Sequence, residues 1–317
     1  MNLKKRNYQN SEDYWRLREF LRRVMLLNGR RELSWHVARL DYWIWFANAD
    51  LEKISLEEQV FFWETEDGQL AACLNPEERG IAFLQVDPTF RSPQLLEEMV
   101  STAEAHLSIT QDGQRRLNIY LDSQDQLAQQ VLARRGFQPN HRPEWTETQH
   151  RRSLDAPLPP VPPTPGYTLR PLEGGLELLE RCYASGLGFH ADDIHTARDN
   201  RDHPEWYHHI QSAPLYRRDL DLVAVALDGS IASFCTIWLD DVTRTAYFEP
   251  VATVPAHQRK GLGTAVILAG LHRLQRMGCQ VAFIGGYSRA ANALYFSVMG
   301  PEHDISEPWE KILPSQD

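Results

Sequence analysis

The sequence predicts an α/β protein made of two domains with a similar order of elements, and three observations predict it. The chain has 317 residues, 42% of them apolar and 24% charged, which suits a globular protein long enough for two separate cores. A proline-rich segment at residues 155–166 divides the chain near its middle. On each side of it, short apolar runs typical of strands alternate with segments of helical character.

The elements expected in the first half follow the order β–α–α–β–β–β–α–β–α. They are a strand at 3–8, helices at 12–27 and 35–49, strands at 60–64, 70–74 and 81–86, a helix at 95–107, a strand at 117–121 and a helix at 126–135. Gly136 follows the last helix, at the position where glycine commonly ends one.

The second half repeats that order. The expected elements are a strand at 167–172, helices at 176–186 and 205–212, strands at 222–227, 231–239 and 245–254, a helix at 264–277, a strand at 281–284 and a helix at 290–298. Asp228-Gly229 is a hairpin turn signal between two apolar runs. Apolar residues within 264–277 recur at helical spacing, and Gly278 ends that helix. We therefore expect a repeat at the level of topology.

Residues 155–166 are expected to be an extended, semi-rigid spacer. Six of these twelve residues are proline, which fixes φ and removes a hydrogen-bond donor. A ligand for a proline-recognising partner domain is the alternative. The spacer predicts a first domain at 1–154 and a second at 167–317.

Composition limits the classes of partner. The net charge of −10 is divided about evenly between the halves, so neither offers the basic face that nucleic acid binding needs, and a cationic or amine partner is favoured. The four cysteines are scattered without a CxxC pair, as in a reducing compartment. The N-terminal segment is polar, and no apolar run approaches the ~20 residues of a membrane span. We expect a cytoplasmic protein without membrane contact, and its oligomeric state stays open.

The segment with the clearest chemistry is FEPVATVPAHQRKGLGT, residues 248–264. A strand runs into a turn, Gly261 and Gly263 flank one residue, and a helix follows at once. Glycines let the backbone approach a ligand closely, and the N–H groups at a helix start attract phosphate oxygens. Arg259 and Lys260 add two cations. A tight turn with solvated basic residues is the alternative.

Residues 167–312 resemble the GNAT superfamily of N-acyltransferases. Gln258, Gly261 and Gly263 match its acyl-CoA signature [QR]xxGx[GA], and NALY at 292–295 lies in the expected later helix. The resemblance implies a mixed, mostly antiparallel twisted sheet flanked by helices in each domain. It also implies acetyl-CoA as co-substrate, direct attack by an amine, and no metal.

The resemblance also implies a set of cofactor contacts. Backbone groups of Val251, Ala252 and Thr253 would contact the pantetheine arm and the thioester, and Asn292 would contact the cofactor. The pyrophosphate would be held by Arg259, Lys260, Gly261, Leu262, Gly263 and Thr264. Pro250 lies inside the preceding strand, which a fully paired ladder would not tolerate. We therefore expect that strand to bulge and splay from its neighbour, with a harmless proline on an edge strand as the alternative.

Two residues are candidates for proton transfer. By resemblance Tyr295 would protonate the departing thiolate, although a core tyrosine is the alternative. Glu249 is the candidate general base, with an ammonium-binding or a structural carboxylate as the alternatives. The histidine-rich segment 190–209 fits no established metal-ligand signature. The resemblance implies that it lies over the acceptor pocket and contacts the acceptor, with an ordinary polar surface or a metal site as the alternatives.

The first half departs from the family pattern. Residues 86–94 lack both glycines and contain Pro93, and Val131 stands where the second half has Tyr295. We expect a degenerate GNAT-like domain that binds no coenzyme A, supports the fold and shapes the acceptor cleft. Its aromatic segment 35–46 is expected to be a buried helix face, although ligand stacking is possible.

The tandem arrangement resembles mycothiol synthase-like proteins in architecture only. The predicted function is transfer of an acetyl group from acetyl-CoA to a primary amine of a small molecule. A protein or peptide N-acetyltransferase and a non-catalytic acyl-CoA-binding protein are the alternatives. The sequence leaves the acceptor and the acyl chain length open.

Overall fold

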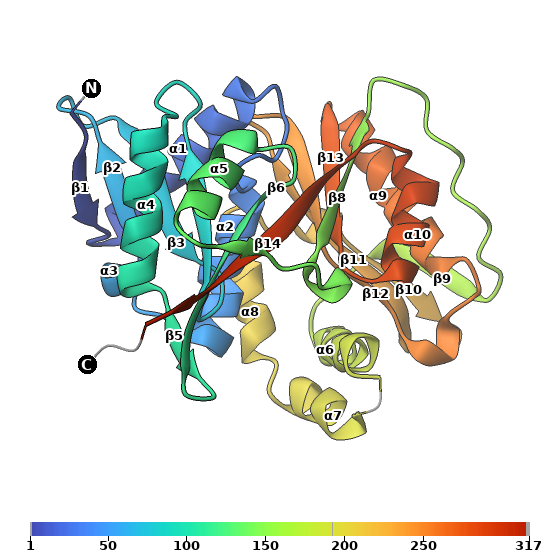
Figure 1. The fold of residues 1–317 in the computed structure, drawn as a ribbon. Coiled ribbons are helices and arrows are strands. Elements are labelled where there is room, and N and C mark those ends of the chain that lie inside the picture. Colours follow the sequence, from blue (N-terminus) through green and yellow to red (C-terminus); the bar gives the residue numbers. More distant parts are fainter. Residues whose placement is uncertain (1, 192, 315–317) are drawn as a thin grey trace. The chain divides into compact units, whose positions relative to one another are not determined.

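The computed structural model describes residues 2–191 and 193–314, which fall into two compact units (Figure 1). Unit 1 comprises residues 2–149 and 303–314, and unit 2 comprises residues 150–302. Each unit is a mixed sheet flanked by helices, which confirms the expected fold class.

The sheet of unit 1 has the strand order β1-β2-β3-β4-β6-β14. The bounds are β1 Lys4–Asn7, β2 Phe61–Glu64, β3 Leu70–Pro76, β4 Ile81–Val86, β6 Gln114–Asp122 and β14 His303–Leu313, with β5 Ile109–Gln111 beside β6 and β7 Gln138–Pro139 beside β14. β4 and β6 are parallel, and the other neighbours in this order are antiparallel.

The sheet of unit 1 is accompanied by α-helices, a π-helix and a short 3-10 helix. They are α1 Ser11–Leu27, α2 Val37–Tyr42, the π-helix η1 Trp43–Glu52, α3 Leu56–Gln59, α4 Pro93–His106, α5 Gln126–Arg134 and the short η2 Pro143–Trp145. Leu96 and Met99 of α4 and Val131 of α5 are fully buried in one apolar cluster with strand residues. The valine at the tyrosine-equivalent position is therefore a core residue.

The sheet of unit 2 has the order β8-β13-β12-β11-β10-β9. The strands are β8 Glu147–Ser153, β9 Tyr167–Pro171, β10 Asp221–Ala226, β11 Ile231–Asp240, β12 Thr245–Thr253 and β13 Val281–Gly286. β12 pairs parallel with β13. The pairs β9–β10, β10–β11 and β11–β12 are antiparallel. The single parallel step recurs at the same place as in unit 1, which confirms the expected repeat.

Helices cover both faces of the unit 2 sheet. They are α6 Leu176–Phe189, α7 Ile194–Asp202, α8 Glu205–Ser212, η3 Arg218–Leu220, η4 Pro255–His257, α9 Leu262–Arg276 and α10 Arg289–Met299. α9 and α10 bury their apolar side chains with Cys235 and Ile237 of β11. The intervening Thr236 contacts Arg181 of α6, because successive strand residues point to opposite faces.

The terminal strands differ from the domain division expected from the sequence. Residues 303–314 lie with unit 1, where Trp309 of β14 is paired with Ile119 of β6. Residues 150–154 lie with unit 2, where Leu154 N–H donates to the Gln280 carbonyl at 2.8 Å. The expected boundaries, 1–154 and 167–317, place both segments in the other half. Neither strand was expected, because HDISEPWEKIL and ETQHRRS carry charged residues and a proline among few apolar ones.

Other local expectations need correction. The single α-helix expected at 35–49 is α2 followed by the π-helix η1, and the His36 ring caps α2 by accepting from the Ala38 N–H at 3.0 Å. The aromatic residues Trp35 and Trp43 are buried, as expected. α7 was not expected, because its sequence is polar throughout. Asp193 caps it by accepting from the His195 N–H at 2.9 Å.

Residues 155–166 contain neither helix nor strand within the described chain, which agrees with the expected spacer. Side chains of α9 hold the spacer by its backbone. Gln275 donates to the carbonyls of Leu154 and Ala156 at 2.8 and 3.0 Å, and the His272 ring bonds the Pro159 carbonyl at 2.8 Å.

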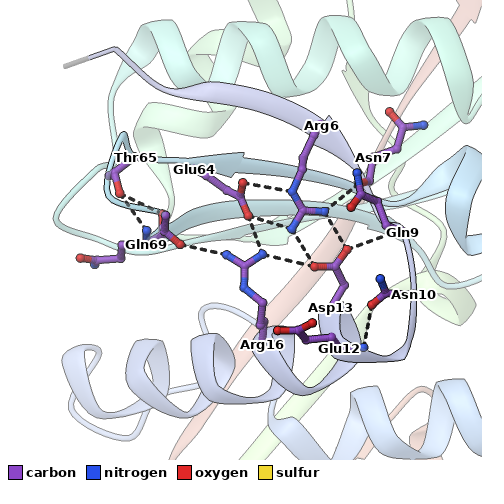
Figure 2. Close-up of polar contacts among 11 residues, drawn as sticks. Arg6, Asn7, Gln9, Asn10, Glu12, Asp13, Arg16, Glu64, Thr65 and Gln69 are labelled. Atoms are coloured by element: carbon purple, nitrogen blue, oxygen red, sulfur yellow. Dashed lines mark hydrogen bonds and ion pairs between the residues drawn. The ribbon is translucent and has the colours of Figure 1, made fainter.

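A partly buried ion-pair network joins β1, α1 and β2 in unit 1 (Figure 2). The Arg6 guanidinium lies 2.6 Å from an Asp13 oxygen and 2.8 Å from a Glu64 oxygen, and Arg16 lies 2.7 Å from Glu64. Burial alone would raise the pKa of both carboxyl groups, but the hydrogen bonds and charges of Arg6 and Arg16, together with the Gln9 N–H at Asp13, outweigh it and lower both pKa values. The network therefore binds the first strand to the rest of its unit.

Two further observations concern the chain as described. All four cysteines, at 73, 182, 235 and 279, are buried free thiols. Among the described residues, no helix has both the length and the apolar character needed to cross a bilayer.

Candidate active site

β12 of unit 2 carries a bulge at the predicted proline. Cys235 is paired with Val251, and the next pair joins Ile237 to Phe248, so that Glu249 and Pro250 together oppose Thr236. Trp238 Nε1 donates to the Glu249 carbonyl at 2.6 Å and holds the bulged backbone. The bulge expected from Pro250 is confirmed.

β12 separates from β13 just before the bulge. Within the described residues their parallel pairing ends at Tyr247 and Phe283, although β12 continues to Thr253 and β13 to Gly286. The edge of β12 that faces away from β11 thus has no neighbouring strand over its last residues.

Val251, Ala252 and Thr253 lie on this open part of β12 and are half-buried. The Ser233 hydroxyl of β11 donates to the Ala252 carbonyl at 2.9 Å and lies 2.9 Å from the Thr253 hydroxyl oxygen. On the opposite side, a β-carbon at Gly188 of α6 would lie 2.8 Å from the Ala252 β-carbon. α6 therefore rests directly on the predicted cofactor strand.

The glycine-containing loop joins β12 to α9. Gln258 Nε2 donates to the Thr253 carbonyl at 3.1 Å and ties the loop to the strand end. Gly261 precedes the first residue of α9 with φ +77°, in the left-handed region that favours glycine. Among the described residues no side chain caps this helix, so its exposed first N–H groups present a partial positive charge.

Gly263 and Leu262 fix how α9 starts. A β-carbon at Gly263 would lie 3.0 Å from Leu294 Cδ2 of α10 and 3.5 Å from the Thr253 hydroxyl oxygen, so the glycine lets three elements meet closely. Leu262 is buried, whereas Thr264 is half-buried beside the helix start.

The cations of the loop lie at its surface. Arg259 and Lys260 are exposed, and Lys260 Nζ donates to the Tyr167 hydroxyl at 3.0 Å. That hydroxyl is also 3.0 Å from His257 Nδ1. His257 thus helps to fix the Tyr167 side chain, to which Lys260 donates.

Tyr295 of α10 is 7% exposed, and its ring meets the His150 ring edge-on with centroids 5.7 Å apart. A β-carbon at Gly286 would lie 3.1 Å from Tyr295 Cδ2, so this glycine admits the ring. Burial, with smaller effects from Cys235 and Glu249, raises the pKa of Tyr295. The phenol therefore stays protonated at neutral pH.

Glu249 is half-buried on the bulge. Its charge is one of those that raise the Tyr295 pKa, so the fold brings the two candidate proton-transfer residues into one neighbourhood. Asn292 lies one turn before Tyr295, and its Oδ1 is 3.1 Å from His150 Nε2. The amide oxygen expected to face a cofactor is thus used within the unit.

In the described part of the chain, no group of three or more His, Cys, Asp or Glu side chains is arranged so that it could hold a metal ion. His203 lies 3.7 Å from Asp199 on the exposed face of α7. Asp192, which the sequence places within the histidine-rich segment, lies outside the described residues.

Sequence reasoning missed a buried polar cluster on the α6 face of the sheet. Asp221 is fully buried and accepts hydrogen bonds from Tyr207 at 2.6 Å and Tyr216 at 2.9 Å. Thr236, opposite the bulge, donates to Asp221 at 3.1 Å and accepts from Arg181 at 3.3 Å. These residues come from different elements, so no contiguous motif marks them.

Arg181 is the most unusual member of this cluster. It is fully buried, its guanidinium carbon lies 3.5 Å from the centre of the Phe234 ring, and its Nε and Nη1 have no hydrogen-bond partner in the described chain. A buried cation is costly unless compensated, so Asp221 and the aromatic faces must offset its charge.

Comparisons with known proteins agree with this geometry. The model of the acetyltransferase (GNAT) family matches residues 180–300, which contain the bulge, the loop and Tyr295. No curated protein matches the chain significantly.

Solved structures resemble the chain along its whole length. A GCN5-related N-acetyltransferase from Sphaerobacter thermophilus has a TM-score of 0.64 at 19% identity, covering 99% of this chain and 97% of its own. A tandem GNAT protein from the clavulanic acid biosynthesis pathway has a TM-score of 0.63 at 14% identity, with both chains fully covered. A GNAT family acetyltransferase from Colwellia psychrerythraea has a TM-score of 0.58 at 11% identity, covering 97% of this chain and 100% of its own. Residues 180–300 therefore match the GNAT acetyltransferase family, and the chain as a whole has the fold of these tandem-domain structures.

Proposed function

We propose that unit 2 transfers an acetyl group from acetyl-CoA to the primary amine of a small molecule. The observation that carries the proposal is the coincidence, in one unit, of a splayed strand, an uncapped helix start and a buried tyrosine. Each feature has a different role in the reaction. The splayed strand offers backbone groups to an extended ligand, the helix start offers a partial positive charge to phosphate, and the tyrosine is a proton donor.

In this proposal the cofactor lies along the open edge of β12. Backbone groups of Val251, Ala252 and Thr253 bind the pantetheine arm and stabilise the oxyanion that forms when the amine attacks the thioester carbonyl. The loop and the helix start bind the pyrophosphate through Arg259, Lys260, Gly261, Leu262, Gly263 and Thr264, and Asn292 contributes a contact from α10.

The proton balance involves the two remaining candidates. Glu249 takes a proton from the attacking ammonium, directly or through water, so that the amine lone pair can form the new C–N bond. The C–S bond then breaks, and Tyr295 gives its proton to the departing thiolate. The second proton that the nitrogen loses in becoming an amide returns Tyr295 to the phenol, directly or through water. The raised Tyr295 pKa supports this order, since the phenol is protonated when the thiolate leaves.

Release of free thiol from acetyl-CoA tests the proposal. With a panel of small primary amines, the wild-type chain should release thiol in an amine-dependent manner, and Gly261→Glu should abolish it, because a carboxylate would repel the phosphates from the helix start. Release that depends only on a peptide N-terminus or a protein lysine would change the acceptor class. Acetyl-CoA binding without release for any amine would leave a binding protein.

A further inference from the structure

Unit 1 keeps a cleft where its own central strands separate. The parallel pairing of β4 and β6 ends at Phe83 and Tyr120 within the described residues, while the strands continue to Val86 and Asp122. A cleft of about 60 Å³ lies there. At roughly 15 Å³ per water, that volume holds about four water molecules, or a ligand of a few heavy atoms.

The features that would bind coenzyme A phosphates are closed off in this unit. The Ser92 hydroxyl caps α4 by accepting from the Leu95 N–H at 3.3 Å, and Pro93 supplies no N–H at the first helical position. An ion pair between Arg91 and Asp125 links the loop before α4 to the cap of α5. The helix start that serves as an anion site in unit 2 is therefore occupied by the chain itself in unit 1.

The lining of the cleft is acidic. Among the described residues it carries five carboxylates against two guanidinium groups: Glu32, Asp122, Asp125, Glu147 and Asp304, with Arg39 and Arg91. Arg39 pairs with Glu147 at 3.0 Å, and Arg31 from outside the cleft pairs with Asp304. For Asp122, no ion pair exists within residues 2–191 and 193–314. Burial raises its pKa, and the Gln124 N–H, which donates at 2.7 Å, and the Arg31 charge offset this only in part, so a further cation beside it would offset the remaining cost.

The cleft also has an aromatic wall. The Phe83 ring lies 5.1 Å from the Trp35 ring and stacks on Tyr120 at 5.2 Å. The Arg39 guanidinium carbon lies 5.2 Å from the Trp35 ring and 5.0 Å from the Phe83 ring, so these faces already accommodate one cation. Trp35 is 3% exposed, and its Nε1 has no hydrogen-bond acceptor among the described residues.

We propose that this cleft of unit 1 binds a small alkylammonium ligand that carries an oxygen acceptor, with Asp122 pairing to its ammonium group and Trp35 donating to its oxygen. The acidic lining and the cation-compatible wall favour the ammonium group, and the unused Trp35 N–H favours the oxygen. This inference does not rest on the activity proposed for unit 2. Under this proposal the degenerate unit 1 contains a second binding site, for a ligand chemically different from that of unit 2, and does more than support the fold.

Titration of the full chain with ethanolammonium chloride, followed by the indole N–H signals in ¹H–¹⁵N spectra, tests the proposal. The Trp35 signal, identified by its loss in Trp35→Phe, should shift saturably. Ethylammonium, which lacks the hydroxyl, should bind more weakly. Asp122→Asn should weaken binding by roughly tenfold to a hundredfold, because one charged hydrogen bond contributes that much. Glu58→Gln, which removes an exposed carboxylate elsewhere in unit 1, should bind like the wild type.

Calorimetry provides the second measurement if Trp35→Phe does not fold. The heat of ethanolammonium binding should then be reduced in Asp122→Asn and unchanged in Glu58→Gln. Equal affinity in the wild type and Asp122→Asn would overturn the proposal, as would the absence of any shift. A shift of the Trp35 signal by acetyl-CoA would also overturn it, because the cleft would then be a coenzyme site.

Discussion

At the scale of single residues, Tyr295 shows how burial serves chemistry. Its ring is packed among apolar side chains and the His150 ring. This packing excludes water and therefore destabilises the anionic form of the phenol. The same packing that makes Tyr295 resemble an ordinary core residue also keeps its proton in place. Core residue and general acid are therefore compatible interpretations of this position.

Replacement of Tyr295 by Phe removes only the hydroxyl. We expect kcat to fall by roughly 10²–10⁴-fold, the usual contribution of a general acid, with the KM for acetyl-CoA nearly unchanged. In the wild type, the raised pKa keeps the Tyr295 phenol protonated near pH 10, where an ordinary tyrosine ionises. We therefore expect that kcat does not decline as the pH rises to about 10.

Tyr8→Phe is the matched control, since Tyr8 is also 7% exposed but lies in unit 1. Steady-state kinetics over a range of pH would measure both effects. Full activity in Tyr295→Phe would remove the hydroxyl from the mechanism.

At the scale of elements, the bulge of β12 depends on a polar layer beneath it. Thr236 opposes the bulge and joins the buried charges of Arg181 and Asp221 through its hydroxyl. Because the low-dielectric interior makes an unpaired charge expensive, the two charges must be considered together.

Asp221→Asn leaves the Arg181 charge without its counter-charge. We expect a loss of about 3–5 kcal/mol in the free energy of unfolding, as when one partner of a buried pair is removed. The double variant Asp221→Asn/Arg181→Met should recover part of it, because no buried charge remains. Urea unfolding would measure both, with Asp241→Asn as an exposed control that should change little. Additive losses in the double variant would contradict the coupling.

The network of Figure 2 makes the attachment of β1 sensitive to acid. The folded-state pKa values of Asp13 and Glu64 are lowered, so their contribution is present above the unfolded carboxyl pKa of roughly 4 and is lost as pH falls through the folded values. Arg6→Met should make the free energy of unfolding less dependent on pH in that window. Denaturant titrations at several acidic pH values would measure this.

Arg142→Met is the control for that experiment, because Arg142 stacks on Trp145 and has no ion pair in the described chain. An unchanged acid dependence in Arg6→Met would mean that the network adds nothing to stability.

The sequence predicted different parts of the site unequally well. The loop at 258–264 and the NALY helix were predicted because each is contiguous, and Pro250 alone marked the bulge. The Arg181 cluster joins side chains from separate elements, which no local pattern reveals. The strands at 147–153 and 303–313 were missed because they acquire their partners only through long-range pairing.

At the scale of the whole molecule, the two units share a topology but differ at the helix that follows the central strand. In unit 2 this helix has no side-chain cap in the described structure, whereas in unit 1 Ser92 caps it. Calorimetric titration with acetyl-CoA should therefore give one site per chain. Gly261→Glu should abolish that site, while Arg91→Glu should leave it intact. Two sites would contradict the degenerate interpretation of residues 86–94.

The membership of β14 in unit 1 has a consequence for biosynthesis. During translation, residues 2–149 leave the ribosome well before residues 303–313. The edge of β6 that pairs with β14 therefore stays unpaired while unit 2 is synthesised. The first unit to be synthesised is thus the last to be completed. A nascent chain halted before residue 303 should expose this edge to other proteins, and it is there that a chaperone would be needed most.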